Sequence, residues 1–221
     1  MRAMSDAAAA TELQLADWRR RVAKLYADVR FLYPDDPVAA WQLWKLEREA
    51  LFREHSQSPL PVGDRARFKA LHWGYDARLA FEVPMEPEPA VGADTVGLAP
   101  ALERPNSGAD TLSFRRIGSV ALPFRDGPRR LSVFWMAGYS GGVFLPFRDA
   151  TNGTETYGAG RYLVDSAKSA DLGGDAGRGT LICDFNFSFQ PSCAFDPQWA
   201  CPLAPPENRL DIPIRAGERI A

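Results

Sequence analysis

Cysteine and histidine are scarce in this chain of 221 residues, which has three cysteines (Cys183, Cys193 and Cys201) and two histidines (His55 and His72). Three thiols are too few for the disulfide framework of a small secreted scaffold. The histidines lie far from the cysteines in the sequence, and there is no Cys-x-x-Cys motif. The composition therefore predicts no metal site, and no motif indicates a cofactor.

Long apolar runs and a strong net charge are also missing. No stretch approaches the roughly 18 consecutive apolar residues of a membrane-spanning helix, and the N-terminal residues lack the continuous apolar segment of a signal peptide. The 26 Lys and Arg residues nearly balance the 28 Asp and Glu residues, giving a formal net charge of −2. That balance gives no electrostatic reason for a nucleic-acid or membrane partner. We therefore expect a cytoplasmic protein with reduced thiols.

Helical periodicity is confined to the first third of the chain. Apolar residues recur at steps of three and four from Leu15 to Leu32, which predicts a helix over residues 12–33 that ends before Pro34. Asp36 followed by Pro37 predicts the start of a second helix running through Phe52. A short third helix is expected at 64–71.

From residue 79 the apolar period changes from about 3.6 residues to about 2, which is typical of strands. Turn signals such as Asn152-Gly153 separate the segments. The expected strands are 79–83, 111–124, 130–136, 143–148, 161–167, 180–189 and 210–215. Residues 84–110 hold five prolines and are expected to form a long loop.

These elements predict an α+β fold in which N-terminal helices pack on an antiparallel β-sandwich or partly closed β-barrel. The helical segment would span residues 1–74 and the β-rich part 75–221. The helices are too short for a core of their own and carry four of the six tryptophans. We therefore expect one structural unit.

Two of the expected strands carry polar residues that share a face. In TLICDFNFSF (180–189), Asp184 and Asn186 lie opposite the phenylalanines, and in RYLVDSA, Arg161 lies on the polar face. If these strands pair with their polar faces aligned, Arg161 reaches Asp184 in a charge-assisted hydrogen bond. The alternative is that this face is simply solvated, as in most antiparallel sheets.

The segment after these strands is rich in proline and contains two of the cysteines. Six of the 18 prolines lie within residues 190–213, so the segment can be an ordered, irregular cover for a sheet edge or pocket. We expect Cys193 and Cys201 to be buried thiols with a structural role. A local disulfide, a zinc site and a Cys–His nucleophile are the alternatives.

Three stretches resemble a bacterial family catalogued as domain of unknown function 1684. They are FRDATNGTETYGAGRYL (147–163), DFNFSFQPSCAFDPQWACPLAPPENRL (184–210) and PIRAGE (213–218). The N-terminal helices look like those of a short, actinobacterial-type branch, without the helix-to-strand segment of the longer members. The resemblance implies no established activity, substrate or cofactor.

The leading functional hypothesis is a β-domain that binds a small molecule or peptide in a polar pocket between segments 147–163 and 184–210. Arg161 would anchor an anionic group of the ligand. The other expected hydrogen-bonding residues are Tyr157, Asp184, Asn186 and Asn208.

Two alternatives remain from the sequence. The first is an enzyme, a hydrolase or isomerase, on the same surface with Asp184 or Glu207 as general base. The second is a partner-binding protein whose helices present Trp41 and Trp44 as an interface. The sequence does not indicate an oligomeric state.

Overall fold

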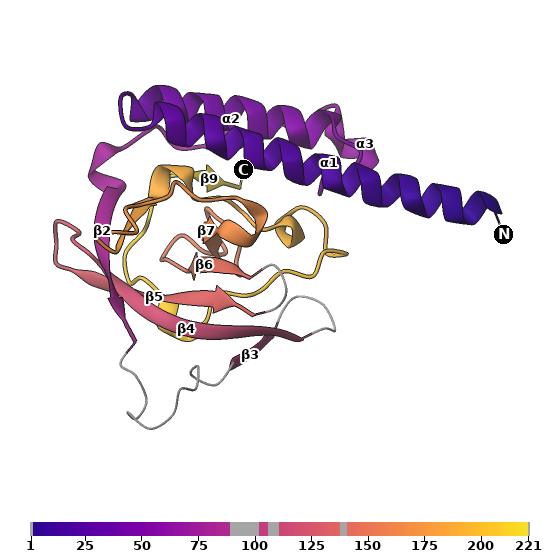
Figure 1. Ribbon diagram of the computed structural model, residues 1–221. Coiled ribbons are helices and arrows are strands. Elements are labelled where there is room, and N and C mark those ends of the chain that lie inside the picture. Colours follow the sequence, from indigo (N-terminus) through magenta and orange to yellow (C-terminus); the bar gives the residue numbers. More distant parts are fainter. Residues whose placement is uncertain (1, 89–101, 106–110, 138–140, 221) are drawn as a thin grey trace.

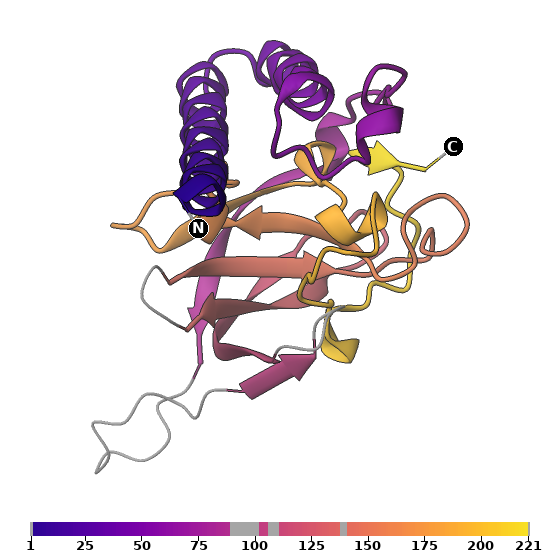
Figure 2. The same ribbon diagram turned by 90° about the vertical axis from the view of Figure 1, so that its right-hand side faces the viewer.

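The computed structural model describes residues 2–88, 102–105, 111–137 and 141–220. Two long helices, α1 (Arg2–Leu32) and α2 (Pro37–Glu54), lie side by side across a curled β-sheet (Figures 1 and 2). A single turn, α3 (Val62–Arg65), follows them. The second helix starts where the sequence predicted, because Asp36 Oδ1 accepts a hydrogen bond from the Ala39 amide at 2.9 Å and Pro37 occupies the first turn.

The larger sheet is antiparallel throughout, with strand order β7-β6-β5-β4-β2-β8 and β3 paired with β4. Its strands are β2 (Ala80–Pro87), β3 (Leu102–Pro105), β4 (Thr111–Leu122), β5 (Arg129–Met136), β6 (Gly142–Phe147), β7 (Arg161–Asp165) and β8 (Thr180–Asp184). A two-stranded sheet pairs β1 (Leu71–His72) with β9 (Glu218–Arg219). Short 3-10 turns lie at Ala77–Leu79, Ser166–Lys168, Phe185–Phe187, Ser192–Ala194 and Pro206–Asn208.

The two edges of the larger sheet approach each other. Tyr162 in β7 and Phe189, just beyond β8, exchange both backbone hydrogen bonds at 2.9 and 3.0 Å. The sheet is therefore a partly closed barrel covered by helices, which confirms the α+β expectation. Of the two architectures predicted, the partly closed barrel is the one formed by the described strands.

Two apolar cores lie on the two sides of this sheet. One fills the curl and includes Phe147 and Phe185, both fully buried. The other lies between helices and sheet, where Trp44 packs on Phe187 with ring centroids 5.5 Å apart. Trp41 and Trp44 are 7% and 0% exposed, so the hypothesis that they form a partner interface is wrong.

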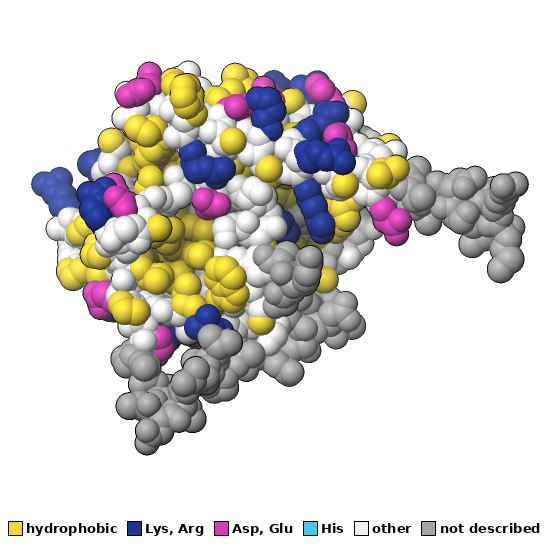
Figure 3. All heavy atoms as spheres, in the orientation of Figure 1, with side chains coloured by type: hydrophobic (Ala, Val, Ile, Leu, Met, Phe, Trp, Pro, Cys, Tyr) yellow, Lys and Arg dark blue, Asp and Glu magenta, His cyan; other side chains and the backbone are white. Residues whose placement is uncertain are grey.

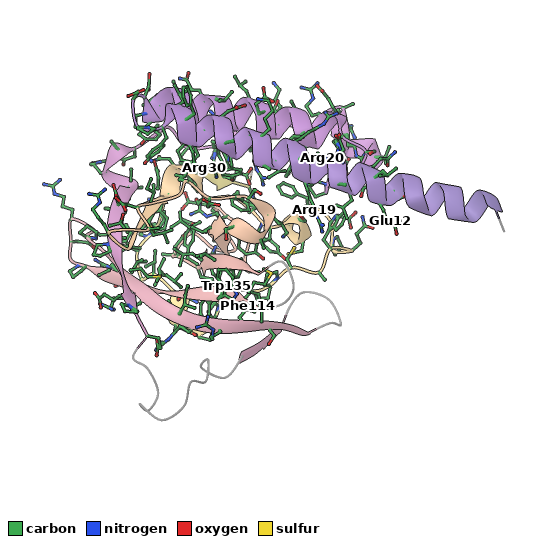
Figure 4. The ribbon with its side chains drawn as sticks, viewed as in Figure 1. Glu12, Arg19, Arg20, Arg30, Phe114 and Trp135 are labelled. Carbon is green, nitrogen blue, oxygen red and sulfur yellow. The ribbon has the colours of Figure 1, made fainter. Side chains whose placement is uncertain are left out.

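Polar contacts also attach the helices to the β-domain. Arg48 of α2 binds Glu218 of β9, with Nε 2.5 Å from Oε1 and Nη2 3.2 Å from Oε2. Arg30 of α1 donates from Nη1 to the Asp171 carbonyl at 2.8 Å. Figure 4 shows Arg30 on the side of α1 that faces the sheet. These contacts attach both helices to the β-domain at residues outside the apolar core.

Several sequence predictions fail in their detail. Within the expected loop 84–110, residues 84–87 belong to β2 and 102–105 form β3, while 89–101 and 106–110 lie outside the described residues. The expected strand 180–189 stops at Asp184, because that side chain accepts the Asn186 amide at 2.8 Å and starts a 3-10 turn. The expected strand 210–215 is not formed. The third helix is 62–65 instead of 64–71.

Candidate functional site

Arg161 lies at the start of β7 and is completely buried. Its Nη2 donates to Asp149 Oδ2 at 2.8 Å and to the Ile214 carbonyl at 2.7 Å, and its Nη1 donates to the carbonyls of Ala216 and Glu218. Burial lowers the pKa of Arg161, and the negative charge of Asp149 opposes that effect. The guanidinium thus joins the 149–161 turn to the segment 214–218.

Asp184 does not pair with Arg161, so that prediction is wrong. The Asp184 side chain is buried under the helices, where the hydroxyls of Tyr33 and Tyr75 both donate to Oδ2 at 3.0 Å. Its Oδ1 accepts the Nδ2 of Asn186 at 2.7 Å. Burial raises the pKa of Asp184, although these hydrogen bonds oppose the shift. The hypothesis of a solvated polar face fails as well, because Asp184, Asn186 and Ser188 are at most 1% exposed.

The side chains of the two asparagines predicted as ligand-binding residues form hydrogen bonds with main-chain groups of the protein. Asn186 accepts the Asp76 amide at 2.8 Å and donates to the Asp76 carbonyl at 2.9 Å. Asn208 accepts the Ser132 amide at 2.8 Å and donates to the carbonyls of Ser132 and Pro146 at 2.9 and 2.7 Å. Both side chains are fully buried, with their amide groups occupied by the protein itself.

Tyr157 lies beside the two cysteines of the proline-rich segment. Burial and a hydrogen bond with Cys193 raise the pKa of Tyr157 to about 12. The Cys193 amide donates to Cys201 Sγ at 3.3 Å, and both side chains are buried as free thiols. The hydrogen bond with Cys193 and burial raise the pKa of Cys201 far above its ordinary value. Glu207 is exposed on the 3-10 turn that follows.

A cavity of about 370 Å³ lies between the helices and the sheet, and we call it the interlayer cavity. Its walls come mainly from α1, α2, the end of β7 with the turn after it, and residues 189–192 and 199–201. The surface is hollowed beneath α1, where Figure 4 labels Arg19 (Figures 3 and 4). The aromatic side chains in the walls are Trp18, Tyr26, Phe52, Tyr162, Phe189 and Trp199. This volume and lining are typical of small-molecule sites.

Asp165 brings a carboxylate to this apolar wall. It ends β7 and is 1% exposed; among the described residues its Oδ1 has no partner, and its Oδ2 has only the ion pair with Lys168. The backbone of Asp165 exchanges hydrogen bonds with Ala170 at 2.8 and 3.0 Å, which fixes the residue in place. The Nζ of Lys168 lies 3.1 Å from Oδ2, while the rest of that side chain is 60% exposed at the cavity rim.

Gln190 supplies another unpaired acceptor to the same cavity. Its amide nitrogen donates to Glu218 Oε2 at 2.7 Å, and its Nε2 donates to the Arg219 carbonyl at 3.3 Å. The side-chain oxygen Oε1 is buried without a partner. Among the described residues, Gln190 Oε1 and Asp165 Oδ1 are therefore two buried acceptors of the cavity lining without a donor, beside an Asp165 Oδ2 that has only Lys168.

Three titratable groups of the lining have raised pKa values. Burial disfavours the charge of Lys168, but the carboxylate of Asp165 outweighs it and raises the pKa of Lys168. Burial raises the pKa of both Tyr26 and Tyr162 far above the ordinary value. Near neutral pH the lysine is therefore a cation and the two phenols are neutral.

The described residues include no group of three or more His, Cys, Asp or Glu side chains that could hold a metal ion. In the same part of the chain, no helix is long and apolar enough to cross a membrane.

Sequence reasoning located this cavity only in part. The two segments that it brought together contribute Tyr162, residues 189–192 and residues 199–201 to the lining, but the helical walls were not expected. None of Tyr157, Arg161, Asp184, Asn186, Asn208 and Glu207 lines it. Asp165 and Gln190 were missed. The sequence did contain a signal for Asp165. Its carboxylate ends the strand RYLVD, whose other residues are apolar or paired, and a carboxylate in a buried strand needs a polar or charged partner.

Fold and cavity together define an α+β protein with a partly closed barrel under a helical cover. The model of the family described as "Protein of unknown function (DUF1684)" matches residues 66–219, and the chain belongs to this family. The matched residues include Asp165, Lys168 and Gln190, whereas Trp18, Tyr26 and Phe52 lie N-terminal to them.

One solved structure similar to this chain is the solution NMR structure of the uncharacterized protein from gene locus rrnAC0354 of Haloarcula marismortui. The two are 27% identical with a TM-score of 0.57, and the match covers 81% of this chain and 91% of that one. No curated protein matches the chain.

Proposed function

We propose that this protein binds a small organic molecule in the interlayer cavity. The observation that carries the proposal is the buried carboxylate of Asp165 in the wall of an aromatic cavity of about 370 Å³, where Oδ1 has no donor among the described residues and Oδ2 has only the largely exposed Lys168. A buried acceptor left unpaired costs roughly 1–3 kcal/mol. A ligand with a donor group would recover that cost, and the aromatic walls would cover its apolar part.

Binding is favoured over the enzymatic alternative by the state of the cavity groups. A nucleophile or general base needs a pKa shifted toward its working state. The shifts at Lys168, Tyr162 and Cys201 go the opposite way, since each raises the pKa further above neutral. Asp184 and Glu207, the bases expected from sequence, do not line the cavity.

The test is a ligand screen by thermal unfolding, combined with a variant that fills the cavity. Val22 lines the cavity from α1, so Val22→Trp should occupy the space and abolish the stabilisation caused by ligands. Phe31→Trp is the matched control, because Phe31 lies on the same helix and is 87% exposed. A ligand at 100 times its Kd stabilises wild type and control by about 2.7 kcal/mol.

Two results would overturn the proposal. One is that no compound of a chemically diverse library, with cationic, neutral and anionic members, stabilises the wild-type protein. The other is a folded Val22→Trp protein that binds every hit as tightly as wild type does.

The cytoplasmic location and the short, actinobacterial-type branch are part of the same proposal. The location is supported by three buried free thiols. The branch is supported by the form of the N-terminal helices.

A further inference from the structure

We infer that the ligand of the interlayer cavity is an amine carried on an aromatic or similarly flat apolar body, with its ammonium group held by Asp165. This inference rests on the proposed function and names the chemical class of the ligand. It starts from the fully buried side-chain atoms of the described cavity lining that have no hydrogen-bond partner or only the ion pair with Lys168, all of which are acceptors. Asp165 offers two carboxylate oxygens and Gln190 one amide oxygen, and each residue is at most 5% exposed.

A primary ammonium group matches this pattern because it carries three donors and no acceptor. The hydrogen bond from an ammonium to a buried carboxylate is charge-assisted and stronger than a neutral one. A carboxylate or phosphate ligand would instead bring further acceptors and a like charge to Asp165. Of the other cations in the lining, Arg48 is already paired with Glu218 and Arg19 is exposed, so the buried acceptors at the polar end favour a cation.

The walls select for the rest of the molecule. Trp18, Tyr26, Phe52 and Trp199 present ring surfaces to the cavity, and aromatic faces attract cations as well as flat apolar groups. Trp199 is held in the rim by a hydrogen bond from its Nε1 to the Pro59 carbonyl at 3.0 Å. An alkylamine on an aromatic ring would thus meet an apolar surface along its whole length.

Lys168 occupies the position that the ligand's ammonium would take over. Its Nζ is 3.1 Å from Asp165 Oδ2, yet its side chain is 60% exposed and free to swing into solvent. The lysine is then a competitor for the same carboxylate. Removing its charge should strengthen the binding of an amine and weaken the binding of any anion attracted to the rim.

Three indole compounds separate these possibilities: tryptamine, the neutral alcohol tryptophol and the anion indole-3-propionate. Isothermal titration of the full-length protein should show tryptamine binding at least about tenfold more tightly than either of the others. Asp165→Asn should reduce that preference to less than about threefold. The control Asp171→Asn removes the same charge from a residue outside the cavity lining and should leave the preference unchanged.

Lys168→Met provides a second measurement that does not depend on the Asp165 variant folding. It should tighten tryptamine binding by at least about threefold, since a competing cation is removed.

The outcomes distinguish this inference from the proposed function. If tryptophol or indole-3-propionate binds as tightly as tryptamine, or if Lys168→Met weakens tryptamine binding, the amine assignment is wrong while cavity binding stands. If none of the three compounds binds, the assignment is also wrong, and the broader library then decides the proposed function. Tryptamine binding that survives Val22→Trp unchanged would place the amine outside the cavity and overturn the inference.

Discussion

Arg161 and Asp149 form an ion pair in which both side chains are completely buried, with Nη2 and Oδ2 2.8 Å apart. The remaining donors of this guanidinium go mainly to backbone carbonyls of residues 214–218. A charge in such a position is stable only while every partner is present. The pair therefore connects the 149–161 turn to a segment more than 50 residues further along the chain.

Replacing Arg161 by Met should destabilise the protein by about 3–5 kcal/mol, because Asp149 is left buried and uncompensated. The double variant Arg161→Met with Asp149→Asn should be less destabilised than the sum of its single variants, since no lone charge remains. Urea unfolding measures all three. Arg215→Met is the control: its partner Glu155 is exposed, so the midpoint should not change measurably. Additive small losses at Arg161 and Asp149 would contradict the buried pair.

Asp184→Asn should change how stability depends on pH. Burial raises the pKa of Asp184 in the folded protein, whereas an unfolded Asp titrates at about 3.9. The folded state therefore holds this proton more tightly, and the free energy of unfolding falls as pH rises from about 4 through the raised pKa. The variant has no titrating group at residue 184, so its free energy of unfolding does not fall in this way. Relative to wild type, its stability should increase between about pH 4 and the raised pKa and then level off.

Urea unfolding of both proteins between about pH 4 and about pH 7 measures this difference, because the other titrating groups are common to both. The hydroxyls of Tyr33 and Tyr75 can reorient to accept from the new amide, so the variant should fold. A stability difference that is constant across the pH range would contradict a raised pKa.

Gly217→Ala should be far more damaging than Gly153→Ala. Both glycines have positive φ, +74° and +84°, so both substitutions strain the backbone. A Cβ at residue 217 would overlap Ser188 and lie 2.7 Å from the Phe185 carbonyl oxygen, whereas a Cβ at 153 meets no atom within 4 Å. We expect losses of about 1 kcal/mol at Gly153 and at least about 3 kcal/mol at Gly217, by thermal unfolding. Equal losses of stability in the two variants would show that backbone strain at positive φ accounts for both and that the close contacts at Gly217 do not matter.

Removal of residues 1–74 should leave a β-domain that aggregates. The helices cover Tyr162, Phe187 and Phe189, which are at most 8% exposed in the full chain. An uncovered apolar surface of this kind promotes association. Size-exclusion chromatography with light scattering gives the result. A truncated protein that stays monomeric and as stable as the full chain would disprove the single structural unit.

The thiols Cys193 and Cys201 should be reduced in protein purified without reductant. Both are buried, and the raised pKa of Cys201 keeps its thiol protonated and slow to oxidise. Titration after denaturation should find all three cysteines of the chain. A lower number would reveal a disulfide and argue against the cytoplasmic location.

The helices and most strands could be predicted from sequence because their signals are local. The cap at Asp36-Pro37 and the alternation in β4 and β5 each depend on neighbouring residues only. The partner of Arg161 could not be found this way. Alternation put Arg161 and Asp184 on compatible faces, but the strand containing Asp184 ends at that residue. In addition, β8 pairs with β2 and β7 pairs with β6, so the strand pair that the prediction required is not formed by the described residues.

The interlayer cavity was harder still to predict, since it is built between layers. Trp18 and Phe52 have the spacing of ordinary core residues on their helices, and nothing local shows that their faces meet empty space. Asp165 follows the same alternation as its neighbours. Only the way in which helices cross the sheet decides that this carboxylate faces a cavity instead of solvent.

The contacts of Arg161 also limit when the fold can be completed during synthesis, because some of its partners are made much later than Arg161 itself. Its guanidinium binds the Glu218 carbonyl, 57 residues later in the sequence. At synthesis rates of about 5–20 residues per second, β7 leaves the ribosome roughly 3–11 s before this acceptor does. During that time Arg161 can pair with Asp149, which is made before it, but it lacks the carbonyl acceptors of residues 214–218. The barrel can therefore close only late in synthesis, and α1 and α2 emerge well before the surface that they cover is complete.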